Sequence, residues 1–269
     1  MSHIEHWKRQ LRAARIARPA HEQTQRGGGW DARRSSWFNR FAGQNDRSHT
    51  YRFFEPYVRG QVLEVGPGPG AYTRLMVARA ERVVAVEPSP FMVQCLRANL
   101  RGAANLEIVE STIEDYSPRL ETYDFALAAN VVRGIERIDE VLCGVVEHAA
   151  ILAIVTWAYD TLPEWLQGVR AQFAQSARGP DMPNNADLLG VLQELGLPHQ
   201  VHRVDAPYHV FSRLEDAVLW VEGYCSLDPA WREQLAQIVT PCVIEQGGGF
   251  LLPSGRETLV IIVHREGNA

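Results

Sequence analysis

A short apolar segment followed by three alternating glycines constrains this chain more than any other feature of its sequence. Residues 62–65 read VLEV, and residues 66–70 read GPGPG. Glycine is needed where a chain turns sharply off a strand and where a ligand must approach the backbone closely. We expect a helix directly after the turn, over about residues 71–80. The arrangement predicts the first strand–turn–helix unit of an open parallel sheet, in which ligands bind at the carboxyl ends of the strands.

The same alternation of strand and helix continues along the chain. Short apolar runs are separated by helical segments, which predicts βαβ units and a parallel sheet covered on both faces. Two late strands are expected to join the edge of this sheet. We therefore predict an α/β fold with a doubly wound, mostly parallel seven-stranded sheet. The strands are expected at residues 62–65, 82–86, 105–109, 123–128, 151–157, 199–204 and 258–264, and the helices at about 4–18, 71–80, 90–102, 138–149, 162–177, 187–195, 214–223 and 229–246.

Two further regions flank this pattern. Residues 1–57 form a leader that becomes rich in aromatic side chains from residue 30 onward, after a GGG sequence at 27–29 that suggests a hinge. Such aromatic density needs a surface to pack against, so we expect an aromatic helical cover on the domain that follows. Residues 58–269 are predicted to form the ligand-binding domain. Its helical cap, inserted before the last strand, is expected at about residues 160–185 and 212–250.

Charge is divided unevenly between leader and body. Residues 1–52 hold 11 basic and 4 acidic side chains, a net charge of +7, whereas the rest of the chain carries −12 and the whole chain −5. A basic leader on an acidic body can contact phosphate or an acidic membrane surface, or fold back onto its own body. We favour the last of these readings.

An acidic residue at the end of the second expected strand indicates the class of ligand. Glu87 follows Gly66 by 21 positions, the spacing at which a carboxylate accepts hydrogen bonds from ribose hydroxyls. A dinucleotide site has the pattern G-x-G-x-x-G, with helix N-terminal amides facing a pyrophosphate. Here the third glycine, Gly70, comes one position early, and the first strand carries an acidic residue, Glu64. The turn therefore favours a nucleoside ligand that also carries positive charge.

These residues resemble motif I of the class I S-adenosylmethionine-dependent methyltransferases, in which a carboxylate near the turn faces the cationic amino-acid end of the cofactor. Residues 87–92, 111–115 and 123–132 resemble the family's segments after the second strand, after the third strand and at motif IV. Residues 30–33 (WDAR) resemble the leader of bacterial members that fold an N-terminal segment over the cofactor. The resemblance implies that S-adenosylmethionine is held by Glu64, Gly66, Pro67, Gly68, Gly70, Glu87, Pro88, Met92, Ile113, Glu114, Asn130 and Val131.

The segment after the fourth strand bears on the acceptor of the methyl group. Residues 130–133 read NVVR, whereas amino-directed nucleic-acid methyltransferases carry an Asn/Asp-Pro-Pro-aromatic run there. No Pro-Cys motif and no metal-ligand spacing is apparent, so we expect no metal. These departures favour a small-molecule acceptor, aromatic or acidic, over nucleic acid. Two alternatives stay open: a non-catalytic S-adenosylmethionine-binding protein, and an RNA methyltransferase that uses the basic leader.

The sequence leaves the catalytic base unknown. A side chain near the acceptor could remove a proton or line the pocket, but each such side chain could equally have a structural role. The candidates for catalysis are His209, Tyr208 and Arg133, and the candidates for the acceptor pocket are Trp37, Tyr51, Trp157 and Tyr159.

Cysteine usage and hydropathy indicate the cellular compartment of the protein. The four cysteines are far apart and form no C-x-x-C pair, which favours a reducing cytoplasm. The N-terminus lacks the apolar run of a signal peptide. The most apolar stretch, residues 149–158, is about half the ~20 residues that a membrane helix needs. We expect a cytoplasmic monomer or homodimer without a membrane partner.

Overall fold

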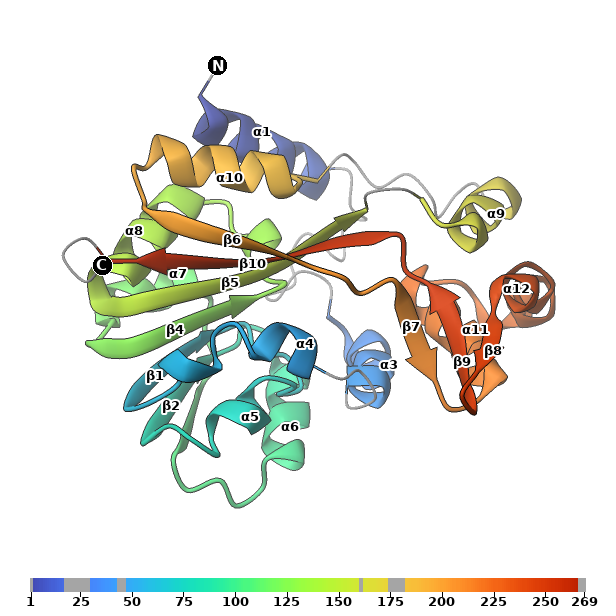
Figure 1. The fold of residues 1–269 in the computed structure, drawn as a ribbon, viewed down its shortest axis with the longest axis horizontal. Coiled ribbons are helices and arrows are strands. Elements are labelled where there is room, and N and C mark those ends of the chain that lie inside the picture. Colours follow the sequence, from blue (N-terminus) through green and yellow to red (C-terminus); the bar gives the residue numbers. More distant parts are fainter. Residues whose placement is uncertain (1, 17–29, 43–46, 160–161, 174–181, 266–269) are drawn as a thin grey trace.

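The computed structural model describes residues 2–16, 30–42, 47–159, 162–173 and 182–265 (Figure 1). Its centre is a seven-stranded sheet in the order β3-β2-β1-β4-β5-β10-β6. The strands are β1 (Gln61–Val65), β2 (Arg82–Val86), β3 (Leu106–Val109), β4 (Tyr123–Ala129), β5 (Ala149–Tyr159), β6 (His199–Val204) and β10 (Arg256–His264).

The predicted doubly wound sheet is confirmed by the strand pairing. Strands β1 to β5 pair in parallel, and the two late strands join at the β5 side, where β10 is antiparallel to both β5 and β6. The chain order reverses between β1 and β4, which are neighbours in the sheet. Such a switch point opens a crevice at the carboxyl ends of the strands, where ligands bind in open α/β sheets.

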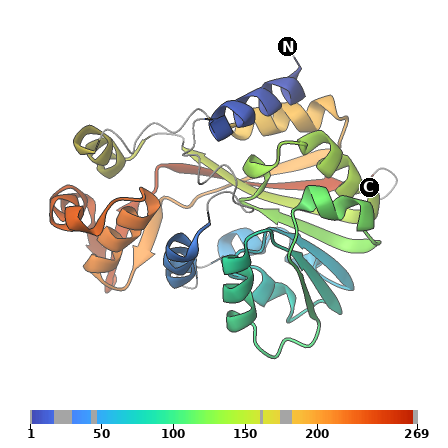
Figure 2. The same ribbon diagram turned by 180° about the vertical axis from the view of Figure 1, so that it is seen from behind.

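Helices cover both faces of this sheet. One face carries α1 (His3–Ile16), α7 (Ile113–Tyr116), α8 (Ile138–His148) and α10 (Asn185–Glu194). The other face carries α4 (Ser48–Tyr51) and α5 (Thr73–Met76), with α6 (Pro90–Asn99) beside them (Figures 1 and 2). The expected helix over 71–80 is shorter than predicted, because turns flank the four residues of α5. The remaining short 3-10 segments are η1 (Glu55–Tyr57), η2 (Ser117–Arg119), η3 (Val132–Gly134), η4 (Pro229–Trp231) and η5 (Thr240–Cys242).

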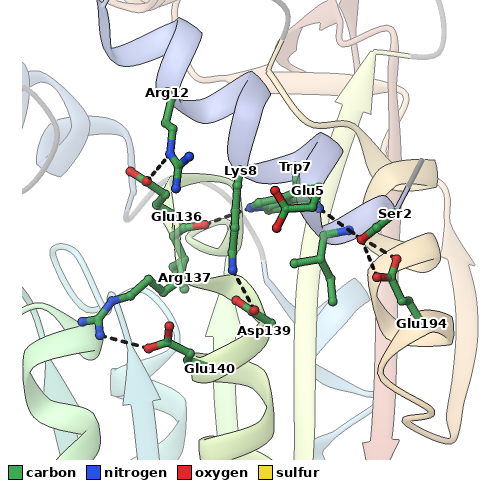
Figure 3. Close-up of polar contacts among 12 residues, drawn as sticks. Ser2, Glu5, Trp7, Lys8, Arg12, Glu136, Arg137, Asp139, Glu140 and Glu194 are labelled. Atoms are coloured by element: carbon green, nitrogen blue, oxygen red, sulfur yellow. Dashed lines mark hydrogen bonds and ion pairs between the residues drawn. The ribbon is translucent and has the colours of Figure 1, made fainter.

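The basic N-terminal helix α1 folds back onto the acidic body. Trp7 is fully buried, and its Nε1 donates a hydrogen bond of 2.9 Å to the carbonyl oxygen of Ile135. Figure 3 shows the ion pairs around it: Lys8 Nζ lies 2.7 Å from Asp139 Oδ2, and Arg12 Nε lies 2.8 Å from Glu136 Oε1. Three of the helix's positive charges, Lys8, Arg12 and Arg15, are thus paired within the chain. The continuation of the expected helix to residue 18 and the expected hinge at 27–29 lie outside the described residues.

A separate cap lies to one side of the sheet, with α3 (Ala32–Ala42) between cap and body (Figure 1). It consists of α9 (Glu164–Gln172), α11 (Leu214–Tyr224), α12 (Arg232–Val239) and a second sheet, β7-β9-β8, formed by β7 (Tyr208–Phe211), β9 (Gly249–Pro253) and β8 (Ile244–Gln246). These elements share a hydrophobic cluster of their own, centred on Trp165, Trp220 and Leu235.

The prediction of an all-helical cap was therefore wrong at its C-terminal part. The expected helix over 229–246 ends with α12, and residues 244–246 form a strand instead. Gly247 and Gly248 have φ of 62° and 77° and connect Gln246 to its pairing partner Gly249. Two successive residues with positive φ fit a type I′ hairpin turn, which glycine adopts without strain.

Within the described residues, no helix is both long and apolar enough to cross a membrane.

Candidate functional site

The glycine turn links the end of β1 to the helical turns that follow. Gly66 N donates to the carbonyl oxygen of Val86 at 2.9 Å, which ties the turn to β2. Gly66, Gly68 and Gly70 all have positive φ, of 64°, 56° and 93°. A Cβ atom on Gly66 would lie 2.6 Å from Val131 Cγ2. The turn therefore requires glycine both for its backbone conformation and for the close approach of the segment after β4.

Glu87 lies at the carboxyl end of β2 and joins three parts of the site. Its Oε2 accepts a hydrogen bond of 3.0 Å from Gly68 N, and its Oε1 accepts one of 2.9 Å from Ser89 N. The side chain is buried, and this burial raises the pKa of Glu87, although the two backbone hydrogen bonds act in the opposite direction. Each carboxylate oxygen has a second lone pair, so Glu87 keeps the capacity to accept hydrogen bonds from a ligand.

The segment after Glu87 begins helix α6 as the sequence predicts. Pro88 is half-buried, and Ser89 caps the helix by accepting a hydrogen bond from Met92 N at 3.3 Å. Met92 itself is buried beneath the helix. Ser89 Oγ also donates to the carbonyl oxygen of Trp30 at 3.2 Å, which brings the leader to this corner of the site.

Glu64 lies under the turn and is almost fully buried. Its Oε2 accepts a hydrogen bond of 2.6 Å from Thr73 Oγ1. Burial raises the pKa of Glu64 to about 8, and the nearby Glu87 carboxylate adds to the shift. A cation bound close to this carboxyl would stabilise its ionised form.

The ends of β3 and β4 complete this edge of the sheet. Ser111 N donates to the carbonyl oxygen of Glu87 at 3.2 Å, and α7 follows, with Ile113 buried and Glu114 half-buried. Asn130 is exposed and has a φ of 57°, and Val131 packs against Gly66. The structure thus brings the predicted cofactor residues from β1, β2, β3 and β4 to one edge.

Helix α3 lies over the glycine turn. Phe38 Cε1 is the atom nearest to the position that a Gly68 Cβ would occupy, at 3.8 Å. Asn99 Nδ2 donates both to Asn39 Oδ1, at 2.7 Å, and to the carbonyl oxygen of Pro69, at 2.8 Å. Phe38, Asn39 and Asn99 were not singled out from the sequence. The aromatic density of residues 30–57 was the available signal, but it could not say which side chain would meet the turn.

The two aromatic candidates of the leader lie apart from each other. Trp37 faces the cap, where its ring centre lies 6.3 Å from that of Trp220. Tyr51 is buried in the core of the body, with its ring 5.3 Å from that of Phe54 and its hydroxyl donating to the carbonyl oxygen of Leu75 at 3.4 Å. The side chain of Tyr51 therefore has the core position that was its alternative reading.

Near the end of β5, the structure places Trp157 under two arginines. The guanidinium carbon of Arg256 lies 3.6 Å from the centre of the Trp157 ring. Arg133 donates to the carbonyl oxygens of Pro183, at 2.6 Å, and of Trp157, at 3.0 Å, so it anchors backbone segments here. Tyr159 ends β5, and its side chain lies outside the described residues.

The cap contributes His209 and Tyr208 from strand β7. Tyr208 is exposed, whereas His209 is only 8 % exposed and its ring centre lies 4.1 Å from that of Trp220. Burial, with Arg256 and Arg47 nearby, lowers the pKa of His209 well below its usual value. Its imidazole is therefore neutral at pH 7, with one ring nitrogen that donates and one that accepts a hydrogen bond. Within the described ranges, no group of three or more His, Cys, Asp or Glu side chains could hold a metal ion.

Comparison with known proteins agrees with this geometry. A family described as "Methyltransferase domain" matches residues 62–150. The chain is 49 % identical over 55 residues to the "Probable ribosomal RNA small subunit methyltransferase A" of Methanopyrus kandleri, covering 20 % of each chain. It is 28 % identical over 120 residues to the "rRNA adenine N-6-methyltransferase" of Saccharopolyspora erythraea, covering 44 % of this chain and 27 % of that protein. The chain thus spans only about a quarter or less of the length of these curated relatives.

A solved structure extends the likeness of the fold to most of the chain. The YcgJ protein of Bacillus subtilis superposes with a TM-score of 0.55 at 14 % identity, over 82 % of this chain and 100 % of that one. The sheet order, the site at its carboxyl edge and the matched domain lead to one assignment. Residues 62–150 match a methyltransferase domain, and the sheet that holds them has the class I methyltransferase fold.

Proposed function

We propose that this protein transfers the methyl group of S-adenosylmethionine to a small-molecule acceptor. The observation that carries the proposal is the position of Glu87, whose buried carboxylate joins the glycine turn to the start of α6. A carboxylate at the end of the second strand suits the hydroxyls of a ribose. The residues that would hold the cofactor are Glu64, Gly66, Pro67, Gly68, Gly70, Glu87, Pro88, Met92, Ile113, Glu114, Asn130 and Val131.

The residues present fit this cofactor in charge and in space. Glu64 and Glu87 are both acidic and buried, which suits a ligand that carries an ammonium and a sulfonium. Gly66 has no room for a side chain, so the backbone itself forms this wall of the site. Phe38, on helix α3, covers the turn from the leader side. When bound, the cofactor supplies an electrophilic methyl group: an acceptor lone pair forms the new bond to its carbon while the carbon–sulfur electron pair stays on sulfur.

The chain's own contribution to such a displacement is alignment, exclusion of water and, where the acceptor carries a proton, its removal. Helix α3 and the cap can exclude water, because α3 lies against the glycine turn and the cap packs against α3. His209, which is buried and uncharged at pH 7, is our candidate for a side chain that hydrogen-bonds to the acceptor. We place the protein in the reducing cytoplasm, because all four cysteines are free thiols.

A turnover assay tests this function. The full chain is incubated with S-adenosylmethionine and pools of small metabolites, and formation of S-adenosylhomocysteine is measured against the Glu87→Ala variant as background. We expect at least one small-molecule pool to give turnover above that background. Cofactor binding without turnover in any pool would instead favour a non-catalytic S-adenosylmethionine-binding protein.

An RNA methyltransferase is the second candidate, because the curated relatives named above are ribosomal RNA methyltransferases. Two observations favour a small molecule over RNA. Residues 130–133 read NVVR rather than an Asn/Asp-Pro-Pro-aromatic run, and Lys8, Arg12 and Arg15 of the leader are paired with acidic residues of the body. RNA affinity of the full chain that falls steeply with salt would support the RNA candidate.

A further inference from the structure

The junction of cover, cap and body contains buried polar nitrogens that have no hydrogen-bond partner. Among the described residues, these include Nε2 of His209, Nε of Arg47 and Nε1 of Trp37. They come from three separate parts of the chain: strand β7, the residue before α4, and helix α3. Buried donors and acceptors in native proteins are nearly always satisfied, so such a set calls for a partner.

The contacts of these residues place them around one position. The rings of His209 and Trp37 both pack on Trp220, with centroids 4.1 and 6.3 Å away. Arg47 lies with its guanidinium carbon 5.6 Å from the ring centre of Tyr72, just after the glycine turn, and its charge also reaches His209. Arg47 therefore packs on Tyr72 of the body and lies near His209 of the cap.

A second arginine meets the same position from the sheet. Arg256, the first residue of β10, lies over Trp157 at 3.6 Å, and its guanidinium carbon is 5.7 Å from the Trp220 ring centre and 5.6 Å from that of Tyr224. Trp157 lies near the carboxyl end of β5, beside the end of β4. This is the edge of an open α/β sheet at which ligands bind.

We infer that the methyl acceptor carries an oxyanion, a carboxylate or a phosphate-type group, that binds between Arg47 and Arg256 and hydrogen-bonds to His209. Guanidinium groups bind carboxylates and phosphates through paired, charge-assisted hydrogen bonds. The aromatic rings of Trp157, Trp220 and Tyr224 suit a flat apolar body attached to that group. This inference rests on the proposed function, because it names the class of acceptor for the same site.

The test titrates the full chain, saturated with S-adenosylhomocysteine, with benzoate, phenylphosphonate and the neutral benzamide. We expect one or both anions to bind at least about tenfold more tightly than benzamide, the size expected for one charge-assisted hydrogen bond. The preferred anion distinguishes a carboxylate from a phosphate-type acceptor. Equal affinity for benzamide and the anions, with cofactor binding intact, overturns the inference and leaves the proposed function standing. Failure of the wild type to bind S-adenosylhomocysteine overturns the proposed function itself.

Variants locate the anion. Arg47→Gln and Arg256→Gln should each weaken anion binding by about tenfold. Arg256→Lys keeps the charge but loses the paired donors, so it should weaken binding less than Arg256→Gln does. Arg74→Gln is the matched control, because Arg74 and Arg47 both line a separate cavity of about 300 Å³ between α4 and the glycine turn. Loss of affinity in Arg74→Gln equal to that in Arg47→Gln would place the anion in that cavity and contradict the inference.

His209 provides a readout that separates binding from folding. His209→Leu removes an unpartnered buried nitrogen, so it should leave the thermal unfolding temperature unchanged or raise it while it weakens anion binding. A drop in unfolding temperature with unchanged anion affinity would give His209 a purely structural role and contradict the assigned hydrogen bond.

Discussion

Glu64 carries a pH dependence that can be measured without any ligand. Its pKa is about 8 in the folded chain, raised mainly by burial, against about 4.3 in an unfolded chain. Between these values the folded state keeps a proton that the unfolded state has lost. The free energy of unfolding therefore falls as pH rises through this window, by up to about 1.4 kcal/mol per pH unit, and levels off above about pH 8.

Glu64→Gln is neutral at every pH and should remove this decline. Urea unfolding at pH 5.5 and 7.5 measures the free energy of unfolding of both proteins. The variant should gain stability relative to the wild type at the higher pH. Glu81→Gln, at an exposed position just before β2, is the control and should follow the wild type. Parallel pH profiles for wild type and Glu64→Gln would show that the buried carboxyl does not have a raised pKa.

Gly66 tests the close approach of the turn to Val131. Gly66→Ala places a Cβ 2.6 Å from Val131 Cγ2 in a backbone of φ 64°. We expect it to lower the free energy of unfolding by about 1–3 kcal/mol and to weaken binding of S-adenosylhomocysteine. Gly102→Ala is the matched control, since its φ of 94° is also positive but no atom lies within 4 Å of the added Cβ. It should be destabilised by about 1–2 kcal/mol from strain alone and bind the cofactor normally. Equal effects on binding would contradict the steric account.

The meeting of the glycine turn with Glu87 could be predicted at the level of residues because its signals are local. The glycines follow one strand at a fixed spacing, and the acidic residue ends the next strand. Such residues meet where the two parallel strands are neighbours, as Gly68 and Glu87 do. The acceptor side could not be predicted in this way. The positions of Trp37 and His209 depend on how α3 and the cap pack on the body, which no local pattern specifies.

At the scale of elements, strands buried in the parallel sheet were predicted within one or two residues of their bounds, because continuous apolar runs mark them. The cap sheet was missed. Strand β8 is only three residues long and exposed, so it has no apolar pattern. The preceding amphipathic segment indicates a helix. A Gly-Gly pair between two extended runs is nevertheless a hairpin signal, and it lies at residues 247 and 248.

Helix α1 docks on the body through a buried tryptophan. Trp7 is fully buried against the face that carries α8 and α10, so Trp7→Ala should lower the free energy of unfolding by about 3–5 kcal/mol. Ile16→Ala, on the same helix but 77 % exposed, should change it by less than about 0.5 kcal/mol. Chemical denaturation of both variants measures these changes in the free energy of unfolding. A small effect for Trp7→Ala would mean that α1 is not an integral part of the folded body.

In the whole molecule, three parts meet at the candidate site: the sheet, the leader and the cap. The sheet supplies the glycine turn, the leader reaches this turn through α3, and the cap brings His209 and Trp220 to the end of β5. The uneven charge of the sequence has an internal explanation in α1, where basic side chains meet acidic residues of the body. Salt should accordingly weaken the docking of the leader more than it affects the sheet.

The most direct test of the account is calorimetric titration of wild type, Glu87→Ala and Glu81→Ala with S-adenosylmethionine and S-adenosylhomocysteine, with NAD as the control ligand. Glu87 lies at the carboxyl end of β2, whereas Glu81 precedes the strand at its opposite end. We expect micromolar binding of both sulfur ligands, weakened about tenfold or more, or ~1.4 kcal/mol, in Glu87→Ala and unchanged in Glu81→Ala. Tighter binding of NAD, no binding of either sulfur ligand, or equal affinities in the two variants would contradict the account.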